Sequence, residues 1–324
     1  MTRSPSNCRD GLKRLWQTSA PLTATALGMT VVFALTMAGI WLDPRTIGGA
    51  PAWLKPAKFA ASLGVYSITL AWIFTWLPDW PRLTRTAGRI TAVVFVVELA
   101  VIALQAARGT TSHFNVSTPL DGVLFGVMGA GIMLQTFASV AFAVALWRQA
   151  FVNRAMGWAL RIGMVITIVA AFSGGLMTQP TQDQLAEARA TGRMVTSGAH
   201  TVGAPDGDPG LTGTGWSTTR GDLRVPHFLG LHAMQAMPLM ALAIASLCRR
   251  REWQVRLVVT AGLSYAALFV VLLSQALRGH SVVSLDGWTA ELLGGWLIAT
   301  VSGLWLAARR TNASSSVRGM SHVA

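Results

Sequence analysis

The chain has 324 residues, of which 52% are hydrophobic and only 12% are charged, and its mean hydropathy is +0.49. Soluble domains carry about 25% charged residues, so this composition excludes an ordinary soluble enzyme, and the high hydrophobicity excludes a disordered chain. The formal net charge of +13 combines 26 Lys and Arg with 13 Asp and Glu.

Eight apolar runs of about 20 residues, the length that a helix needs to cross a bilayer, follow one another along the chain. We predict membrane spans at 22–42, 58–78, 88–107, 121–147, 156–178, 227–248, 255–277 and 287–308. The runs are too long and too uniformly apolar for barrel strands. The predicted fold is therefore an all-α polytopic membrane protein with eight transmembrane helices.

The positive charge is unevenly distributed between the connections. If the N-terminus is cytoplasmic, the inner segments hold 17 of the 26 basic residues, whereas the outer segments hold nine, together with eight of the 13 acids. This is the positive-inside pattern of a membrane protein, and it needs no nucleic acid as a partner. It predicts a bacterial inner (plasma) membrane protein with both termini in the cytoplasm, the lipid bilayer as its partner, and a first helix that is retained rather than cleaved.

Short motifs recur in the two halves of the chain. Gln105-Ala-Ala-Arg-Gly109 recurs as Gln275-Ala-Leu-Arg-Gly279, and Leu120-Asp-Gly122 recurs as Leu285-Asp-Gly287. Such repetition at matching places predicts an internal repeat. Because four helices return the chain to its starting side, the two units are expected to run parallel.

The repeat predicts the organisation of the chain. Residues 1–150 would form the first four-helix repeat with a basic cytoplasmic N-terminal tail, and residues 151–310 would form the second. A long outer loop at 178–225, rich in turn-forming residues, interrupts the second repeat. Residues 311–324 would be a disordered cytoplasmic tail. A loop this long is usually functional or disordered, so it is also a candidate docking surface for a small molecule or a protein.

The unusual polar residues are predicted to gather on the outer face. They are Lys55, Lys58, Arg108, His113, Asp121, His200, Asp222, Arg224, His227, His232, Arg278, His280 and Asp286. Each has a structural and a functional interpretation. Arg108-Gly and Arg278-Gly, with Asp121 and Asp286 as N-caps, are explained by helix ends, or they pair around a central cavity. Lys55 and Lys58 reach the membrane interface, or they bind an anionic ligand or headgroup.

The histidines are candidate cofactor ligands, in particular His113, His227, His232 and His280. On a regular helix His227 and His232 would point about 140° apart, so they would not chelate one metal ion, and no metal site is predicted. His232 would share a face with Gln235. Against this, a histidine near a helix end is more often a hydrogen-bonded interface residue.

Glu98 is the carboxylate that lies deepest in a predicted span. Such a residue is costly and is functional by default. We expect it to be protonated, bonded to Gln135, or bonded to a small neighbour. Its counterpart in the other half is Leu268, so the halves differ here. Glu291 lies near the outer end of the last span and could join the outer polar group.

Two resemblances follow from these residues. Gly221–Gln235, with Lys55–Phe59 and Arg108–Asn115, resembles a family of uncharacterised multi-pass bacterial membrane proteins over nearly the whole chain, which implies no activity. More distantly, the architecture is similar to haem A synthase, which has two parallel four-helix units and haem-ligating histidines near the outer face. That resemblance implies at most one bis-imidazole haem site, His232 with His280, because Leu63 stands where the other half has His232.

Three functions remain open at this point. The first is a haem- or metal-binding redox protein of the membrane, because helix bundles build cofactor sites between facing helices and imidazole is a common ligand. The second is a small-molecule or ion transporter, with Glu98 as a coupling site. The third is a sensor or assembly subunit that docks a partner at loop 178–225. No catalytic motif is present, so no catalytic residue or reaction is assigned.

Overall fold

The computed structural model describes residues 8–207 and 210–309. Within them the chain is a bundle of long helices with two short two-stranded antiparallel sheets. Seven helices are long and apolar enough to cross a membrane, and a bent pair of helices supplies an eighth candidate span. The structure therefore confirms an all-helical protein with membrane-spanning helices. The predicted tail at 311–324 lies outside the described residues.

The first half of the chain contains four long helices. They are α2 (Ala20–Leu42), α3 (Leu54–Phe74), α4 (Pro81–Ala107) and α5 (Pro119–Arg148). Proline in the first turn begins α2, α4 and α5, where its missing N–H costs no helical bond. In this half α2 packs against α3 and α4, α3 packs against α4, and α4 packs against α5.

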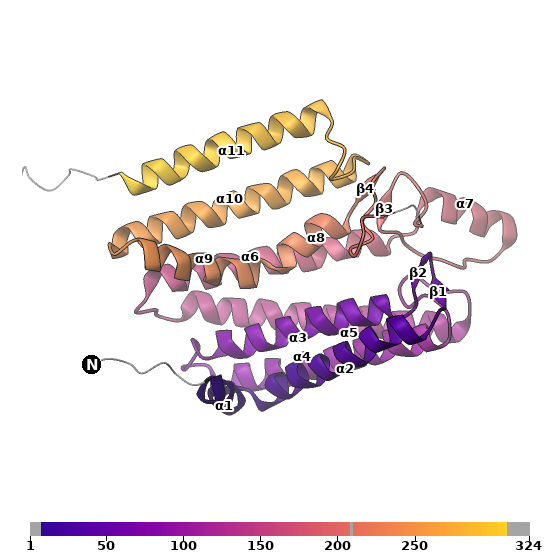
Figure 1. Ribbon diagram of the computed structural model, residues 1–324, viewed down its shortest axis with the longest axis horizontal. Helices are drawn as coiled ribbons and strands as arrows, with labels where there is room; N and C mark the ends of the chain where they lie inside the picture. The colour runs from indigo at the N-terminus through magenta and orange to yellow at the C-terminus, as the bar shows by residue number, and fades with distance from the viewer. Residues whose placement is uncertain (1–7, 208–209, 310–324) are drawn as a thin grey trace, which may run out of the picture.

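The second half has the same order of helix pairing. Its helices are α6 (Arg154–Ser173), α8 (Arg224–Leu231), α9 (Ala233–Leu247), α10 (Arg251–Leu277) and α11 (Gly287–Ala308). Helix α6 packs against α8, α9 and α10, α9 packs against α10, and α10 packs against α11. Contact between α5 and α6 joins the halves, and α11 lies at the edge of the bundle (Figure 1).

The span predicted as one helix over 227–248 is broken. Helix α8 ends at Leu231, α9 begins at Ala233, and the two axes are bent by 49°. Pro238 inside α9 has no N–H to donate to the carbonyl of Met234, in the turn that follows the break. Neighbouring helices satisfy the freed backbone, because Thr167 Oγ1 accepts from Met234 N–H at 3.1 Å and Tyr265 OH donates to the Leu229 carbonyl at 2.6 Å.

Short elements gather at one end of the bundle, which we call the loop end (Figure 1). They are β1 (Thr46–Ile47), β2 (Ala50–Pro51), the 3₁₀ helix η1 (Gly174–Thr178), α7 (Gln182–Thr191), β3 (Thr201–Val202) and β4 (Gly221–Asp222). The predicted loop 178–225 therefore has structure of its own. Its helix α7 begins with a reciprocal Thr181–Gln184 capping box and ends at Gly192, whose φ is +71°.

The opposite end, which we call the terminal end, holds α1 (Cys8–Thr18) and the end of α11 (Figure 1). Helix α1 was not predicted, because it is short and polar. The largest apolar core lies in the half of the bundle nearest this end. Its fully buried large side chains are Leu22, Leu70, Ile73, Leu77, Phe142, Leu146, Met156, Leu160, Met164, Met234 and Met237. They come from both halves, so this core joins the halves and closes the terminal end.

Arg161 of α6 binds the C-terminal end of α5. Its guanidinium donates to the carbonyls of Leu146 and Gln149 at 2.9 and 2.8 Å, at the end of α5. It also lies 5.2–5.7 Å from the ring centres of three aromatic side chains, Trp147, Phe151 and Trp158. A cation at a helix C-terminus is favourable, and cation–π contacts strengthen it.

Arg161→Met should therefore destabilise the protein. Loss of charge-assisted hydrogen bonds is expected to lower the free energy of unfolding by about 1.5–3 kcal/mol, measured by denaturant or thermal unfolding in detergent. Arg148→Met is the matched control, because Arg148 is exposed at the end of α5, the helix end that Arg161 contacts. Equal stability of the two variants would contradict this role.

Candidate functional site

Ionisable side chains from both halves of the chain meet at the loop end. We call this group the loop-end cluster: Lys55 and Lys58 of α3, Glu98 of α4, His113 of the α4–α5 connection, His200 and Asp206 near β3, and Arg224 and His227 of α8. Lys55 interacts electrostatically with Glu98, Asp206, Arg224 and Lys58. His113 interacts with Lys55 and His200, and His227 interacts with His200. The cluster therefore bridges the two halves.

Glu98 is the buried centre of this group. Its side chain is 3% exposed, and Oε1 lies 3.5 Å from His113 Nε2. The second carboxylate oxygen, Oε2, is buried and has no hydrogen-bond partner within the described residues. Glu98 lies nine residues before the end of α4, or about 14 Å from it. A buried polar atom without a partner is costly, so this oxygen marks a place where a ligand or a proton would be stabilised.

The sequence allowed a bond between Glu98 and Gln135, and that expectation is wrong. Gln135 instead accepts from Thr91 Oγ1 at 2.7 Å and lies 3.4 Å from both Tyr66 and Ser139. Buried Thr84, Thr91, Glu98 and Gln105 stand seven residues apart on α4. Because seven residues are nearly two helical turns, they form a polar stripe along one face of that helix.

His113 is held on two sides. Its Nδ1 lies 3.1 Å from Ser112 Oγ, and its ring lies 5.4 Å from that of Phe59. The next residue, Phe114, has a φ of +63°, which is strained for a bulky side chain. Its ring lies 4.8 Å from that of His200. The strained turn therefore places one imidazole beside Glu98 and an aromatic ring beside a second imidazole.

Hydrogen bonds tie the long loop to this turn. Ser197 N–H donates to the Phe114 carbonyl at 2.8 Å, and Val116 N–H donates to the Val195 carbonyl at 3.0 Å. Gly198 has a φ of +117°, and a Cβ there would lie 2.3 Å from the Met177 carbonyl. Only glycine fits this position, so the loop is held close to the cluster.

The charged groups of the cluster differ in how far they are neutralised. Arg224 pairs with Asp222 at 2.6 Å, and His200 pairs with Asp206 at 2.7 Å. Lys58 Nζ donates to the Thr214 carbonyl at 2.8 Å. Among the described residues neither Lys55 nor Lys58 forms an ion pair with a carboxylate. The two lysines are therefore the positive charges of the cluster that remain available to an anion.

His227 joins the cluster from the second half. Its Nδ1 donates to the Ala170 carbonyl at 2.7 Å, because a carbonyl oxygen can only accept. A Cβ on Gly174 would lie 2.9 Å from His227 Cε1, so glycine is required for this ring to reach α6. The bond fixes the tautomer and leaves Nε2 as an acceptor.

The remaining predicted histidines lie elsewhere. His232 stands at the α8–α9 break, with its ring 4.3 Å from that of Phe228. It lies one turn from Gln235, whose amide reaches Thr69 Oγ1 at 3.4 Å. His280 is 44% exposed at the rim, 3.9 Å from Asp286. The bis-imidazole haem site stays a prediction.

Metal binding also lacks a suitable donor set. In the part of the chain that the structure describes, no three His, Cys, Asp or Glu side chains form a group that could hold a metal ion. The haem- or metal-binding hypothesis therefore gains no support from the geometry and stays a prediction.

The repeated Arg and Asp residues form two ion pairs, each at the end of a helix. Arg108 donates to Asp121 at 2.7 Å and also to Gln105, and Arg278 donates to Asp286 at 2.6 Å. Gly109 and Gly279, with φ of +75° and +80°, end the preceding helices. Thus the helix-end interpretation accounts for the repeated motif.

The predicted N-caps need one correction. Asp286 caps α11 by accepting from Thr289 N–H. By contrast, Thr118 caps α5, and Asp121 is the residue whose N–H it receives at 3.2 Å. Asp121 instead accepts from Arg108, Gln105 and Thr118, and is 3% exposed. Its role is therefore to join α4 to α5.

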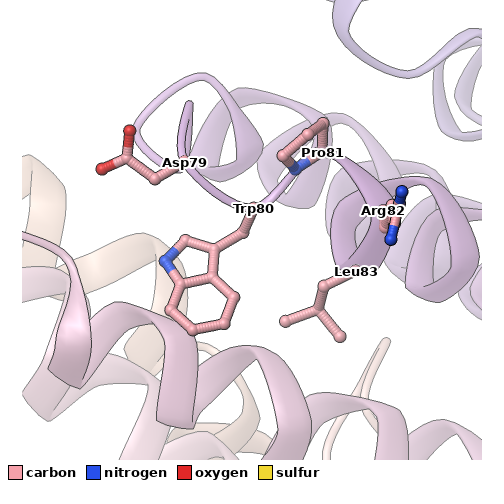
Figure 2. A pocket seen from close by; sticks show the side chains of 5 residues that line it. All are labelled: Asp79, Trp80, Pro81, Arg82 and Leu83. Carbon is pink, nitrogen blue, oxygen red and sulfur yellow. The ribbon is translucent and has the colours of Figure 1, made fainter.

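Depressions at the terminal end lie away from the cluster. One of about 410 Å³ is lined by five consecutive residues, Asp79 to Leu83, at the end of the α3–α4 connection and the start of α4 (Figure 2). Another of about 400 Å³ lies between the starts of α6 and α10. Neither includes a residue of the loop-end cluster. Glu291 is exposed on α11 and also lies outside it.

No protein-family model, curated protein or solved structure matches the chain. The functional argument therefore depends on the geometry of the loop-end cluster.

His113 should make stability depend on pH. Burial, with the nearby charges of Lys55 and His200, holds the pKa of His113 well below its ordinary value of 6.5. In the unfolded chain His113 regains that ordinary pKa, so below about pH 6.5 the unfolded state binds the extra proton. This contribution is present above that pH and is lost as the pH falls, at about 1.4 kcal/mol per pH unit at most.

His113→Asn should therefore reduce the fall in thermal stability between about pH 7 and pH 5. It should remove only part of the fall, because burial also lowers the pKa of His200. Thermal unfolding in detergent at a series of pH values measures the slope. A His113 variant with the wild-type slope would show that folding does not lower the pKa of His113.

Proposed function

We propose that this chain is a membrane transporter for a small anion, which enters the loop-end cluster from the non-cytoplasmic side. The observation that carries the proposal is Glu98, an ionisable side chain buried inside a candidate membrane span. Such residues mark substrate pathways and proton relays in membrane proteins. Two lysines without ion-pair partners lie in the same cluster, and they favour an anion over a cation.

The bent span supports movement of a solute rather than a purely structural bundle. Broken helices occur at membrane depth where they line a site or a water-filled path. Here α8 carries Arg224 and His227 of the cluster, and the break follows at His232. Backbone groups near the break bond to Thr167 and Tyr265 of neighbouring helices, which gives the bend a defined geometry.

The two ends of the bundle differ in a way that suits one state of a transporter. The terminal half is closed by large apolar side chains from both halves of the chain, whereas the polar groups gather in the loop half. Release to the cytoplasm would require the helices of that core to separate. The buried stripe on α4, from Gln105 to Thr84, runs across this region and supplies polar groups along the route.

The proposal includes an orientation. The charge bias of the sequence assigns the loop end to the outside and both termini to the cytoplasm of a bacterial plasma membrane. The shared order of helix pairing in the two halves supports the proposed parallel tandem repeat, in which α2–α5 correspond to α6 and α8–α11.

Cysteine labelling should confirm this orientation. In a variant with Cys8 and Cys248 replaced by Ser, Arg108→Cys and Arg278→Cys should both react with a membrane-impermeant maleimide added to intact cells. Arg82→Cys and Arg256→Cys, at the terminal end, should react only after the membrane is opened. Labelling of Arg108→Cys and Arg278→Cys from opposite sides would exclude the parallel repeat.

Transport should be measurable in vesicles that contain the purified protein. The probes are radiolabelled phosphate, sulfate, malate and succinate, and uptake should be saturable and exceed that of protein-free vesicles for at least one of them. Lys58→Met should reduce uptake about tenfold or more, because removal of a charged hydrogen-bond partner costs about 1.5–3 kcal/mol.

Arg189→Met is the control, since it removes one positive charge from the exposed surface of α7 at the same end. It should leave uptake within about twofold, as expected for a distant screened charge. No uptake of any of the four anions above protein-free vesicles would refute the transporter proposal.

A further inference from the structure

The loop-end cluster presents two kinds of group to a ligand. Lys55 and Lys58 supply positive charge, and neither is paired with a carboxylate in the part of the chain that the structure describes. Glu98 supplies a buried carboxylate oxygen without a partner. The lysines attract an anion, while the carboxylate oxygen can only accept a hydrogen bond.

These requirements conflict for a simple anion. An anion without a hydrogen-bond donor would satisfy the lysines but would face Glu98 Oε2 with acceptor atoms and like charge. The cost of leaving a buried polar group unpaired is what makes such sites selective. An anion that carries its own hydroxyl group satisfies both requirements, because the hydroxyl can donate to Oε2 while the charged oxygens reach the lysines.

The other charged groups of the cluster are already paired. Arg224 Nη2 donates to Asp222 and to the Gly215 carbonyl, both at 2.6 Å, and His200 is held by Asp206. By contrast, the hydrogen bond of Lys58 goes to a neutral carbonyl, that of Thr214. A cation bound to a neutral acceptor gains when an anion replaces it. Lys55, Lys58 and Glu98 are therefore the charged groups left for a ligand, and His227 Nε2 is a further, neutral acceptor.

We propose that Glu98 is a specificity-determining residue, which selects small oxyanions that carry a hydroxyl donor, such as hydrogenphosphate or a hydroxycarboxylate, over matched anions that lack one. The inference rests on the anion site of the proposed function but does not require transport. Its geometric basis is the unpartnered Oε2 beside His113 and in the electrostatic reach of Lys55.

Two matched pairs of anions test the proposal by equilibrium binding to the whole protein in lipid nanodiscs near neutral pH. Phosphate and sulfate have similar size and shape, but only phosphate retains a proton. Malate and succinate differ by one hydroxyl group. The wild-type protein should bind the donor-bearing member of at least one pair about tenfold or more tightly. Equal affinities within both pairs, or no binding of any of the four anions, would overturn the proposal.

Variants of Glu98 and Lys55 distinguish the preference for a hydroxyl donor from the overall attraction of anions by charge. Glu98→Leu removes a negative charge, so affinity for every anion should rise, and the readout is the ratio within a pair, which should fall to about one. Glu98→Gln keeps one acceptor oxygen and should retain part of the preference. Lys55→Met should weaken both members of a pair equally and leave the ratio unchanged. A full preference in Glu98→Leu, with unchanged gel filtration, would overturn the assignment.

The outcomes of binding and flux are distinguishable. Selective binding without uptake into vesicles would retain the site and refute transport. Uptake without preference in either pair would retain transport and refute the role of Glu98.

Discussion

A carboxylate cannot remain isolated inside an apolar bundle, because the loss of hydration would be too costly. The segments around Glu98 are arranged to meet this constraint. Helix α3 contributes the positive charge of Lys55, and the α4–α5 connection contributes His113. The strained backbone at Phe114 and the glycine at 198 then allow the long loop to close over these groups. These partners leave one carboxylate oxygen of Glu98, Oε2, without a hydrogen bond. The proposed anion site depends on this free oxygen.

Polar and apolar contacts divide the bundle along its length. Large apolar side chains join the two halves of the chain near the terminal end, while charged side chains from both halves meet near the loop end. This division gathers most of the ionisable side chains that meet across the two halves near the loop end. The bent span depends on polar neighbours as well. A break in a helix frees backbone groups that need new hydrogen-bond partners, and Thr167 and Tyr265 supply them here.

Local properties of the sequence predicted much of this fold. Length and hydropathy are features of each segment alone, so the eight apolar runs coincide with α2–α6, the α8–α9 pair, α10 and α11. The break at His232 was not predictable, because Pro238 is its only local signal and proline alone does not set the bend. The short helices α1 and α7 carry no long apolar pattern.

The site was predictable only in part. The order of helices placed Lys55, Lys58, His113 and His227 at one end, but which side chains meet depends on helix rotation and loop closure. For that reason the sequence missed Asp206, which pairs with His200. Helix rotation also decides the partner of Gln135, which accepts a hydrogen bond from Thr91 and not from Glu98.

The two halves share their turns but differ in their chemistry. Gly109 and Gly279 adopt the same left-handed conformation. The repeated Arg-Gly motif therefore reflects a shared backbone turn at two helix ends. The position of Glu98 corresponds to Leu268, and that of Lys58 corresponds to His227. Since Leu268 and His227 stand where Glu98 and Lys58 have their counterparts, the anion site proposed above occurs once. A stoichiometry of one molecule of solute per polypeptide is therefore expected.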